Sequence, residues 1–142
     1  MKLCSPEYMQ EVMVRSNADE KYRALAKGQN ETYTMILEPE PAKGVAQASI
    51  AGFEAKDGQI VTVWSGTKPS TFTLSAPYGT WVDILRGKLG ATTAITMRKL
   101  KVQGPFLQLL KGADRTLRWV DILRTIPTEF EGQYAEYAIK GT

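Results

Sequence analysis

Residues 78–112 constrain the fold most, because helix, strand and corner signals follow one another there with little connecting chain. The stretch opens with apolar residues at the i, i+3, i+4 and i+8 spacing of one helix face, at Trp81, Ile84, Leu85 and Leu89. Residues 99–103 (KLKVQ) then alternate polar and apolar side chains, which is the period of a half-buried strand. We therefore expect a helix and then a strand, joined by an apolar connection over residues 91–97.

A corner and a second helix follow this strand. Gly104 permits a sharp turn, and Pro105 suits the first turn of a helix because its missing N–H would have no partner there. Phe106, Leu109 and Leu110 then return to helical spacing. The two amphipathic helices can thus pack their apolar faces on one sheet, and nothing in the stretch is chemically reactive.

The first half of the chain changes from helical to strand periodicity. Ser5-Pro6 predicts the start of one helix, and Asn17 with Glu20 predicts the capped start of a second. Asp57-Gly58 is a strong hairpin signal, and Gly52 is expected to mark a bulge. The β-rich stretches that we expect to form strands lie at residues 32–37, 46–55, 60–64 and 71–75.

The order of these elements predicts the fold class. Helices, then a run of strands, then helix–strand–helix indicate one α+β domain over residues 1–142, with helices covering one face of the sheet. A further helix is expected from residue 114 to Ile126, ended by Pro127. The hexapeptide WVDILR occurs at residues 81–86 and again at 119–124. Its flanks do not match, so it indicates two like-patterned helices rather than a repeat architecture.

The composition excludes several kinds of chemistry. The chain has no histidine and one cysteine, so it can form neither a Ser-His-Asp triad nor a His-ligated or thiolate zinc site. We expect no metal and no cofactor. Asp83 and Asp121, one in each copy of the hexapeptide, could in principle do acid–base work. Solvated aspartates on helix faces are far commoner and no nucleophile–base pair is evident, so we expect no enzyme activity.

Location and targeting signals are sparse. No run of 18 uncharged apolar residues exists, so the sequence predicts no membrane span. The first residues lack the apolar core of a secretory signal, and the lone Cys4 cannot form an internal disulfide. These features lead us to expect a cytoplasmic protein.

Positive charge is concentrated in the second half of the chain. Between Arg86 and Arg124 there are nine Lys and Arg residues but only two acids, although the net charge of the whole chain is only +3. This face could contact an anionic membrane, with Arg86, Lys88, Lys99 and Lys101 as the candidate contacts. The alternative is a solvated face with lysines beside an edge strand. Nucleic-acid binding is not expected, because no aromatic platform is interleaved with these charges.

A family resemblance rests on residues 84–110. The strand KLKVQ ending at Gly104, followed by an amphipathic helix ending at Lys111, resembles the Gly-Lys-Leu-Lys-x-x-Gly signature of the sterol carrier protein (non-specific lipid transfer) family. The resemblance extends over residues 17–111. It implies a five-stranded, mainly antiparallel sheet covered on one face by helices, with an apolar tunnel between the layers. The tunnel would hold fatty acyl chains, acyl-CoA, phospholipid or sterol-like ligands.

The chain departs from this family pattern in three places. Arg98 stands where the family usually has glycine, and Pro105 stands where a polar residue is commoner. Residues 112–142 form a C-terminal extension beyond the usual closing helix, which could cap the tunnel or pair two subunits.

The resemblance and the helix faces together predict the lipid-contacting wall: Phe72, Leu74, Trp81, Ile84, Leu85, Ile95, Met97, Leu100, Val102, Phe106, Leu109 and Leu110. For each residue alone, ordinary core packing is the simpler explanation. A competing hypothesis is an interaction or homodimerisation module with a filled core, in which Trp119 and the helix 117–126 form the contact.

Overall fold

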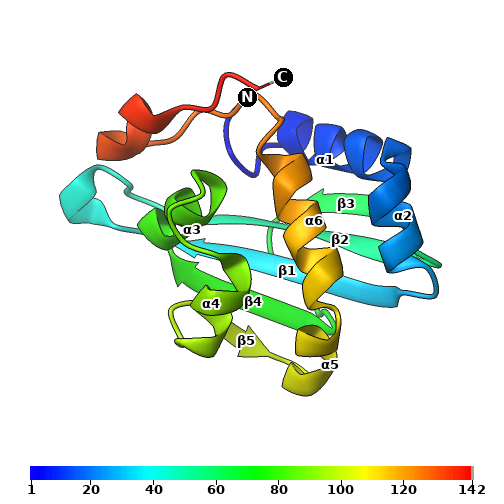
Figure 1. Cartoon of the computed structure of the whole chain (residues 1–142). Coiled ribbons are helices and arrows are strands. Elements are labelled where there is room, and N and C mark those ends of the chain that lie inside the picture. The colour runs from blue at the N-terminus through cyan, green and yellow to red at the C-terminus, as the bar shows by residue number, and fades with distance from the viewer. Residues whose placement is uncertain (142) are drawn as a thin grey trace.

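The computed structural model describes residues 1–141 as helices packed on one sheet (Figure 1). The elements in chain order are α1 (Pro6–Ala18), α2 (Glu20–Ala26), β1 (Asn30–Glu38), the 3-10 helix η1 (Pro41–Lys43), β2 (Ser49–Lys56), β3 (Gln59–Ser65), β4 (Phe72–Pro77), α3 (Tyr78–Leu85), α4 (Ala91–Thr96), β5 (Lys101–Gln103), α5 (Phe106–Lys111), α6 (Ala113–Leu123) and the 3-10 helix η2 (Gly132–Tyr137).

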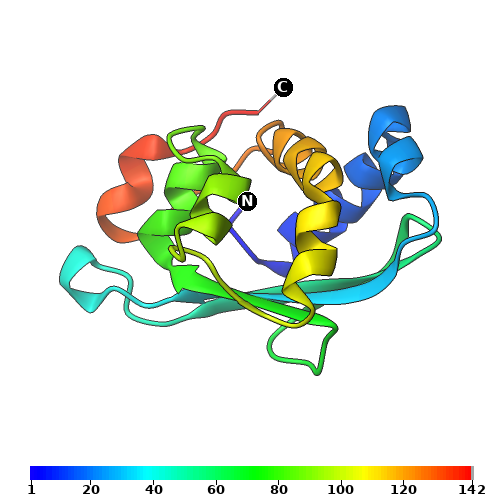
Figure 2. The same ribbon diagram turned by 60° about the horizontal axis from the view of Figure 1, so that its bottom comes forward.

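The sheet has five strands in the order β3-β2-β1-β4-β5. Neighbouring strands are antiparallel except β1 and β4, which run parallel with Tyr33 opposite Phe72 and Met35 opposite Leu74. The helices gather on one face of the sheet (Figure 2). The α+β fold predicted from the sequence, with a mainly antiparallel five-stranded sheet, is therefore confirmed. No helix within residues 1–141 is long and apolar enough to cross a membrane.

The predicted hairpin between β2 and β3 is present, but the expected bulge lies elsewhere. Asp57 and Gly58 both adopt positive φ angles, 48° and 81°, as a tight hairpin turn with this dipeptide requires. The register shifts between Glu54 and Ala55, not at Gly52. Glycine is needed at position 52 for another reason: a Cβ there would lie 2.5 Å from the Trp64 ring and 2.3 Å from a β1 carbonyl oxygen.

The first two helices begin as expected, with one change of capping residue. The Ser5 hydroxyl accepts a hydrogen bond from the Tyr8 backbone N–H at the start of α1. The cap of α2 is Asp19, whose carboxylate accepts from the Tyr22 N–H at 2.8 Å. The Asn17 side chain instead bonds the Ile60 backbone N–H and C=O, each at 2.9 Å, and so ties α1 to β3.

The connection expected over residues 91–97 is a helix, α4, and the strand after it is shorter than expected. Ala91, Ala94 and Ile95 are buried, so packing against the core compensates for the weak helix propensity of the threonines in this segment. The Ala94 carbonyl accepts from the N–H groups of residues 99 and 100. Arg98 lies just before them with φ +60°, a left-handed conformation that favours glycine.

The C-terminal extension completes the helical layer. Helix α6 lies across the sheet between the α1–α2 pair and the α3–α4 pair (Figure 1). Arg118 of α6 forms two hydrogen bonds with Asp19, at 2.6 and 2.9 Å. Arg124 donates to the Ile84 carbonyl at 2.9 Å and so joins the end of α6 to α3. The end of the chain returns to its start, with a bridge between Lys2 and Glu129.

Candidate functional site

An apolar cavity of about 70 Å³ lies between the sheet and the helical layer. Side chains of β1, β2 and β4 form its floor and those of α3, α4, α5 and α6 its roof. Pockets that hold drug-sized ligands usually measure about 300–1,000 Å³. A long lipid chain therefore requires the two layers to separate beyond the spacing that the structure describes.

The cavity wall contains most of the apolar residues predicted from the sequence. Those on the wall are Leu74, Trp81, Ile84, Leu85, Ile95, Leu100 and Leu109. They come from a strand, three helices and the turn before β5, so the predicted apolar faces do converge on one space.

The other predicted residues lie outside this cavity. Phe72 is fully buried in the core, with its ring stacked 5.1 Å from that of Tyr33. Leu110 is half-buried against the same core. Met97 is 58% exposed. Val102 and Phe106 border a groove on the outer surface.

That outer groove adjoins the cavity. Its wall includes Arg98, Lys101, Val102 and Phe106, together with Ile95 and Leu100, which also line the cavity. The Ile95 and Leu100 side chains therefore separate an internal apolar space from the surface of the α4–β5 segment.

The C-terminal helix supplies a part of the wall that was not predicted as a site. Thr116, Trp119, Val120 and Leu123 of α6 all line the cavity. The signal was present in the repeated hexapeptide, because Trp119 and Leu123 correspond to Trp81 and Leu85 of the first copy. Both copies place this Trp and Leu pair on the same cavity.

The two tryptophans of the repeat differ in one hydrogen bond. Nε1 of Trp81 donates to the Ile36 carbonyl at 3.1 Å. Nε1 of Trp119 is buried and has no partner within residues 1–141, while its ring packs 5.3 Å from that of Phe53. The cavity wall thus contains one indole N–H that is satisfied and one that is not.

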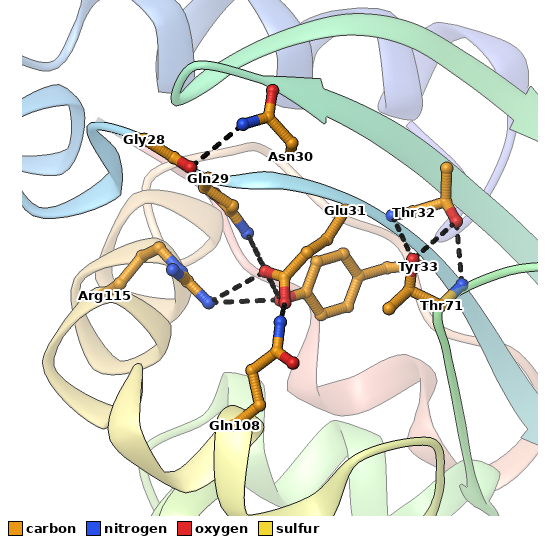
Figure 3. A network of polar contacts seen from close by, with 9 residues as sticks. All are labelled: Gly28, Gln29, Asn30, Glu31, Thr32, Tyr33, Thr71, Gln108 and Arg115. Carbon is orange, nitrogen blue, oxygen red and sulfur yellow. Dashed lines mark hydrogen bonds and ion pairs between the residues drawn. The ribbon is translucent and has the colours of Figure 1, made fainter.

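A polar network closes the wall where β1 begins (Figure 3). We call Gln29, Glu31, Tyr33, Gln108 and Arg115 the Glu31 network. Oε1 of Glu31 accepts from the Tyr33 hydroxyl at 3.0 Å, from Gln29 Nε2 at 3.2 Å and from Arg115 Nη2 at 3.3 Å. Oε2 accepts from the Gln108 amide of α5. Glu31 is only 7% exposed, so these donors compensate for the loss of water around its carboxylate.

Burial keeps the phenols beside this network protonated. Desolvation raises the pKa of Tyr33 well above its usual range, against a smaller opposing effect of Arg115. Desolvation likewise raises the pKa of Tyr22, on the same wall, to about 12. The network's remaining charges are the Glu31 carboxylate and the Arg115 guanidinium, which cancel. Within residues 1–141, no group of three or more Asp, Glu or Cys side chains is placed to hold a metal ion.

The sequence model of the SCP-2 sterol transfer family matches residues 10–113, which is well over half of the chain. The chain belongs to the SCP-2 sterol transfer family. The match ends at the first residue of α6, so the rest of this helix, which lines the cavity, lies outside the matched region. No curated protein sequence matches the chain.

Solved structures agree with this SCP-2 assignment at the level of the fold. A crystal structure of sterol carrier protein 2 has a TM-score of 0.79 and 19% identity, over 88% of this chain and 99% of the other. A conserved hypothetical protein of Thermus thermophilus, described as a candidate sterol carrier protein, has a TM-score of 0.76 and 20% identity, over 87% and 89%. A sec-alkylsulfatase from Pseudomonas sp. has a TM-score of 0.51 and 19% identity, over 75% of this chain but 15% of the enzyme.

Proposed function

We propose that this SCP-2 protein binds the apolar chain of a lipid between its sheet and its helices and carries it between membranes. The apolar cavity under α3–α6 is the single observation that carries the proposal. Each CH₂ group that leaves water for such a space contributes about 0.8 kcal/mol. Fatty acyl chains, acyl-CoA, phospholipid and sterol-like molecules are the ligand classes to be tried first.

We propose the outer groove at α4–β5 as the portal through which lipid passes. Ile95 and Leu100 separate it from the cavity, so a rotation of these two side chains would join the two spaces. Phe106 on the rim is 41% exposed and the adjacent Leu107 is 72% exposed. Exposed apolar side chains beside a ligand cavity suit contact with a lipid surface.

Basic residues beside the portal would attract an anionic membrane. Lys88, Lys99 and Lys101, three of the four predicted contacts, are exposed. The fourth, Arg86, lies over the Tyr137 ring at 3.6 Å, so its guanidinium already has a partner within the chain. Arg98, which lines the groove, adds a further exposed charge. We therefore base the proposed membrane contact on Arg98, Lys99 and Lys101.

The competing hypothesis of dimerisation through α6 has less support. Trp119 packs on Phe53 of the sheet rather than standing free for a partner. Within residues 1–141, Leu117 is the one large apolar residue of α6 with a substantially exposed side chain, and its exposed fraction is 44%. Catalysis also has little support, because Asp121 is engaged with Arg124 at the surface.

Substitution of Leu109 tests the proposal. Leu109 is 3% exposed and lines the cavity, so Leu109→Trp would fill space that a lipid needs. We expect the delipidated variant to stay folded but to lose saturable binding of a fluorescent fatty acid. Its loss in free energy of unfolding should be smaller than the cost of overpacking a filled core, which is about 1–3 kcal/mol. Titration and thermal unfolding measure the two effects.

The control is Val14→Trp, at an exposed position of α1 that lines neither the cavity nor the groove, and this variant should bind normally. Absence of saturable binding to the folded, unmodified protein by fatty acid, acyl-CoA, phospholipid and sterol alike would overturn the proposed function.

A further inference from the structure

The polar groups at the cavity wall carry no net charge once the ion pair between Arg115 and Glu31 is included. Arg115 is the cationic group on the wall, and its Nη2 contacts both the Glu31 carboxylate and the Tyr33 hydroxyl. The Arg115 and Glu31 side chains are 16% and 7% exposed, so the pair is largely shielded from water. Since the two charges cancel and Tyr33 stays protonated, an occupant of the cavity meets no net charge there.

Among the residues that line the cavity, two fully buried side-chain atoms lack partners within residues 1–141, and one is an acceptor while the other is a donor. Nε2 of Gln29 donates to Glu31 and to the Tyr33 hydroxyl, and this fixes the amide so that Oε1 remains as an acceptor. Gln29 is 6% exposed and its Oε1 is buried without a donor. Nε1 of Trp119 is a buried donor without an acceptor. Leaving both unmet is unfavourable, so a ligand that satisfies them gains binding energy.

We infer that the cavity selects lipids whose head is uncharged and both donates and accepts a hydrogen bond, namely a hydroxyl or an undissociated carboxyl. The head would donate to Oε1 of Gln29 and accept from Nε1 of Trp119. This inference rests on the proposed lipid-binding function and adds the chemistry of the head to it.

The same geometry makes Glu31 a determinant of specificity against ionised carboxylates. A carboxylate cannot donate to Gln29 Oε1, and at that position it would lie close to the buried Glu31 carboxylate, which the same Gln29 amide contacts. Arg115 would then serve two anions in a site of low dielectric, where like charges repel strongly. Replacing Glu31 by glutamine removes this repulsion and keeps a side chain of the same shape.

Dodecanol and dodecanoate, two ligands with the same chain, test the inference on the delipidated full chain. At a pH where dodecanoate is ionised, we expect dodecanol to bind at least about tenfold more tightly, a difference of about 1.4 kcal/mol. Glu31→Gln should raise the affinity for dodecanoate until the two ligands differ by less than about threefold. Isothermal titration calorimetry measures both affinities for each variant.

Two tryptophans whose indole N–H is buried without a partner provide a matched pair of variants for the donor. Trp119→Phe removes the unpartnered N–H and should weaken dodecanol binding by about three- to tenfold. Trp64→Phe removes an indole N–H that is likewise buried without a partner within residues 1–141, but Trp64 does not line the cavity, so this variant should leave the dodecanol affinity unchanged.

The outcomes separate the inference from the function on which it rests. Dodecanoate binding to the unmodified chain as tightly as dodecanol would overturn the inference, and so would equal effects of the two tryptophan substitutions on dodecanol. If Glu31→Gln does not fold, the tryptophan pair still decides. Folded protein that binds neither ligand would overturn the proposed function itself.

Discussion

At the scale of single residues, Arg98 departs from the family pattern in side chain but not in backbone conformation. Arg98 stands at a position where the resembling family usually has glycine, and its φ of +60° is the conformation that glycine adopts without strain. The position follows α4, where the Ala94 carbonyl must accept from residues 99 and 100. The left-handed turn is thus kept although its preferred residue is replaced, and the replacement places a charge beside the groove.

Replacing this arginine by glycine should stabilise the protein. Relief of the left-handed strain outweighs the added freedom of the unfolded chain, so we expect Arg98→Gly to increase the free energy of unfolding by about 1 kcal/mol. Urea denaturation measures the change. Lys99→Gly, at a neighbouring residue without a positive φ, should be destabilising. A stability loss in Arg98→Gly would show that its side chain matters more than its backbone.

Some residues of the site could be read from the sequence and others could not. Trp81, Ile84 and Leu85 were predictable because helical spacing identifies the buried face before the fold is known. Glu31 was not, because its burial depends on donors from α5 and α6, Gln108 and Arg115, which are distant along the chain. A polar residue near the start of a strand gives no sign of such partners.

At the scale of elements, α6 is fixed by arginine contacts with the helices on both sides. Arg118 binds the carboxylate that also caps α2, so Asp19 stabilises a helix start and an interhelical contact together. Hydrogen bonding from Arg118 is the main cause that lowers the pKa of Asp19.

The helices α2 and α6 were predicted from the sequence, but the order of the strands in the sheet could not be inferred in the same way. The parallel pairing of β1 with β4 joins segments that local periodicity does not relate.

The lowered pKa gives this contact a defined pH dependence. A carboxyl whose pKa falls on folding stabilises the native state above its unfolded pKa, and the effect is lost as pH falls through the folded pKa. Asp19→Asn keeps a good N-cap but loses the ion pair. We expect the variant to be less stable than the parent near neutral pH and to approach it once the pH is well below 3.8, the ordinary value for the group.

Thermal unfolding across this pH range measures the difference. Asp121→Asn serves as the control, because Asp121 is 54% exposed in its pair with Arg124 and should have a smaller effect. A constant difference between Asp19→Asn and the parent at all pH values would contradict the assignment.

At the scale of the whole molecule, the two layers enclose the cavity, and most arginines of the basic region contact other residues whereas Arg98 and the lysines are exposed. Arg86, Arg115, Arg118 and Arg124 are engaged with other parts of the chain. Lysines between positions 88 and 111 remain exposed. The exposed part of the basic region is therefore smaller than the sequence indicated, and Arg98, Lys99 and Lys101 lie on or beside the α4–β5 segment.

This arrangement predicts which charges govern membrane contact. Each exposed Lys or Arg near an anionic surface contributes about 1 kcal/mol, screened by salt. Lys99→Glu combined with Lys101→Glu should abolish most binding to vesicles that contain phosphatidylserine, whereas Lys21→Glu with Lys56→Glu, the same charge change elsewhere, should have little effect. Co-sedimentation at low and high salt measures binding. Equal losses for both double variants would mean that only net charge matters.

The placement of the three tryptophans gives the chain an optical property of its own. Trp81 and Trp119 line the cavity, whereas Trp64 of β3 lies against Gly52 with the Lys68 ammonium 4.6 Å from its ring. Val63 beside it packs into the core, so alternation along the strand directs Trp64 to the opposite face of the sheet. In a Trp64→Phe variant, the remaining indole emission would arise only from the cavity wall. Its wavelength and quenching would then register whatever occupies the cavity, with no label attached.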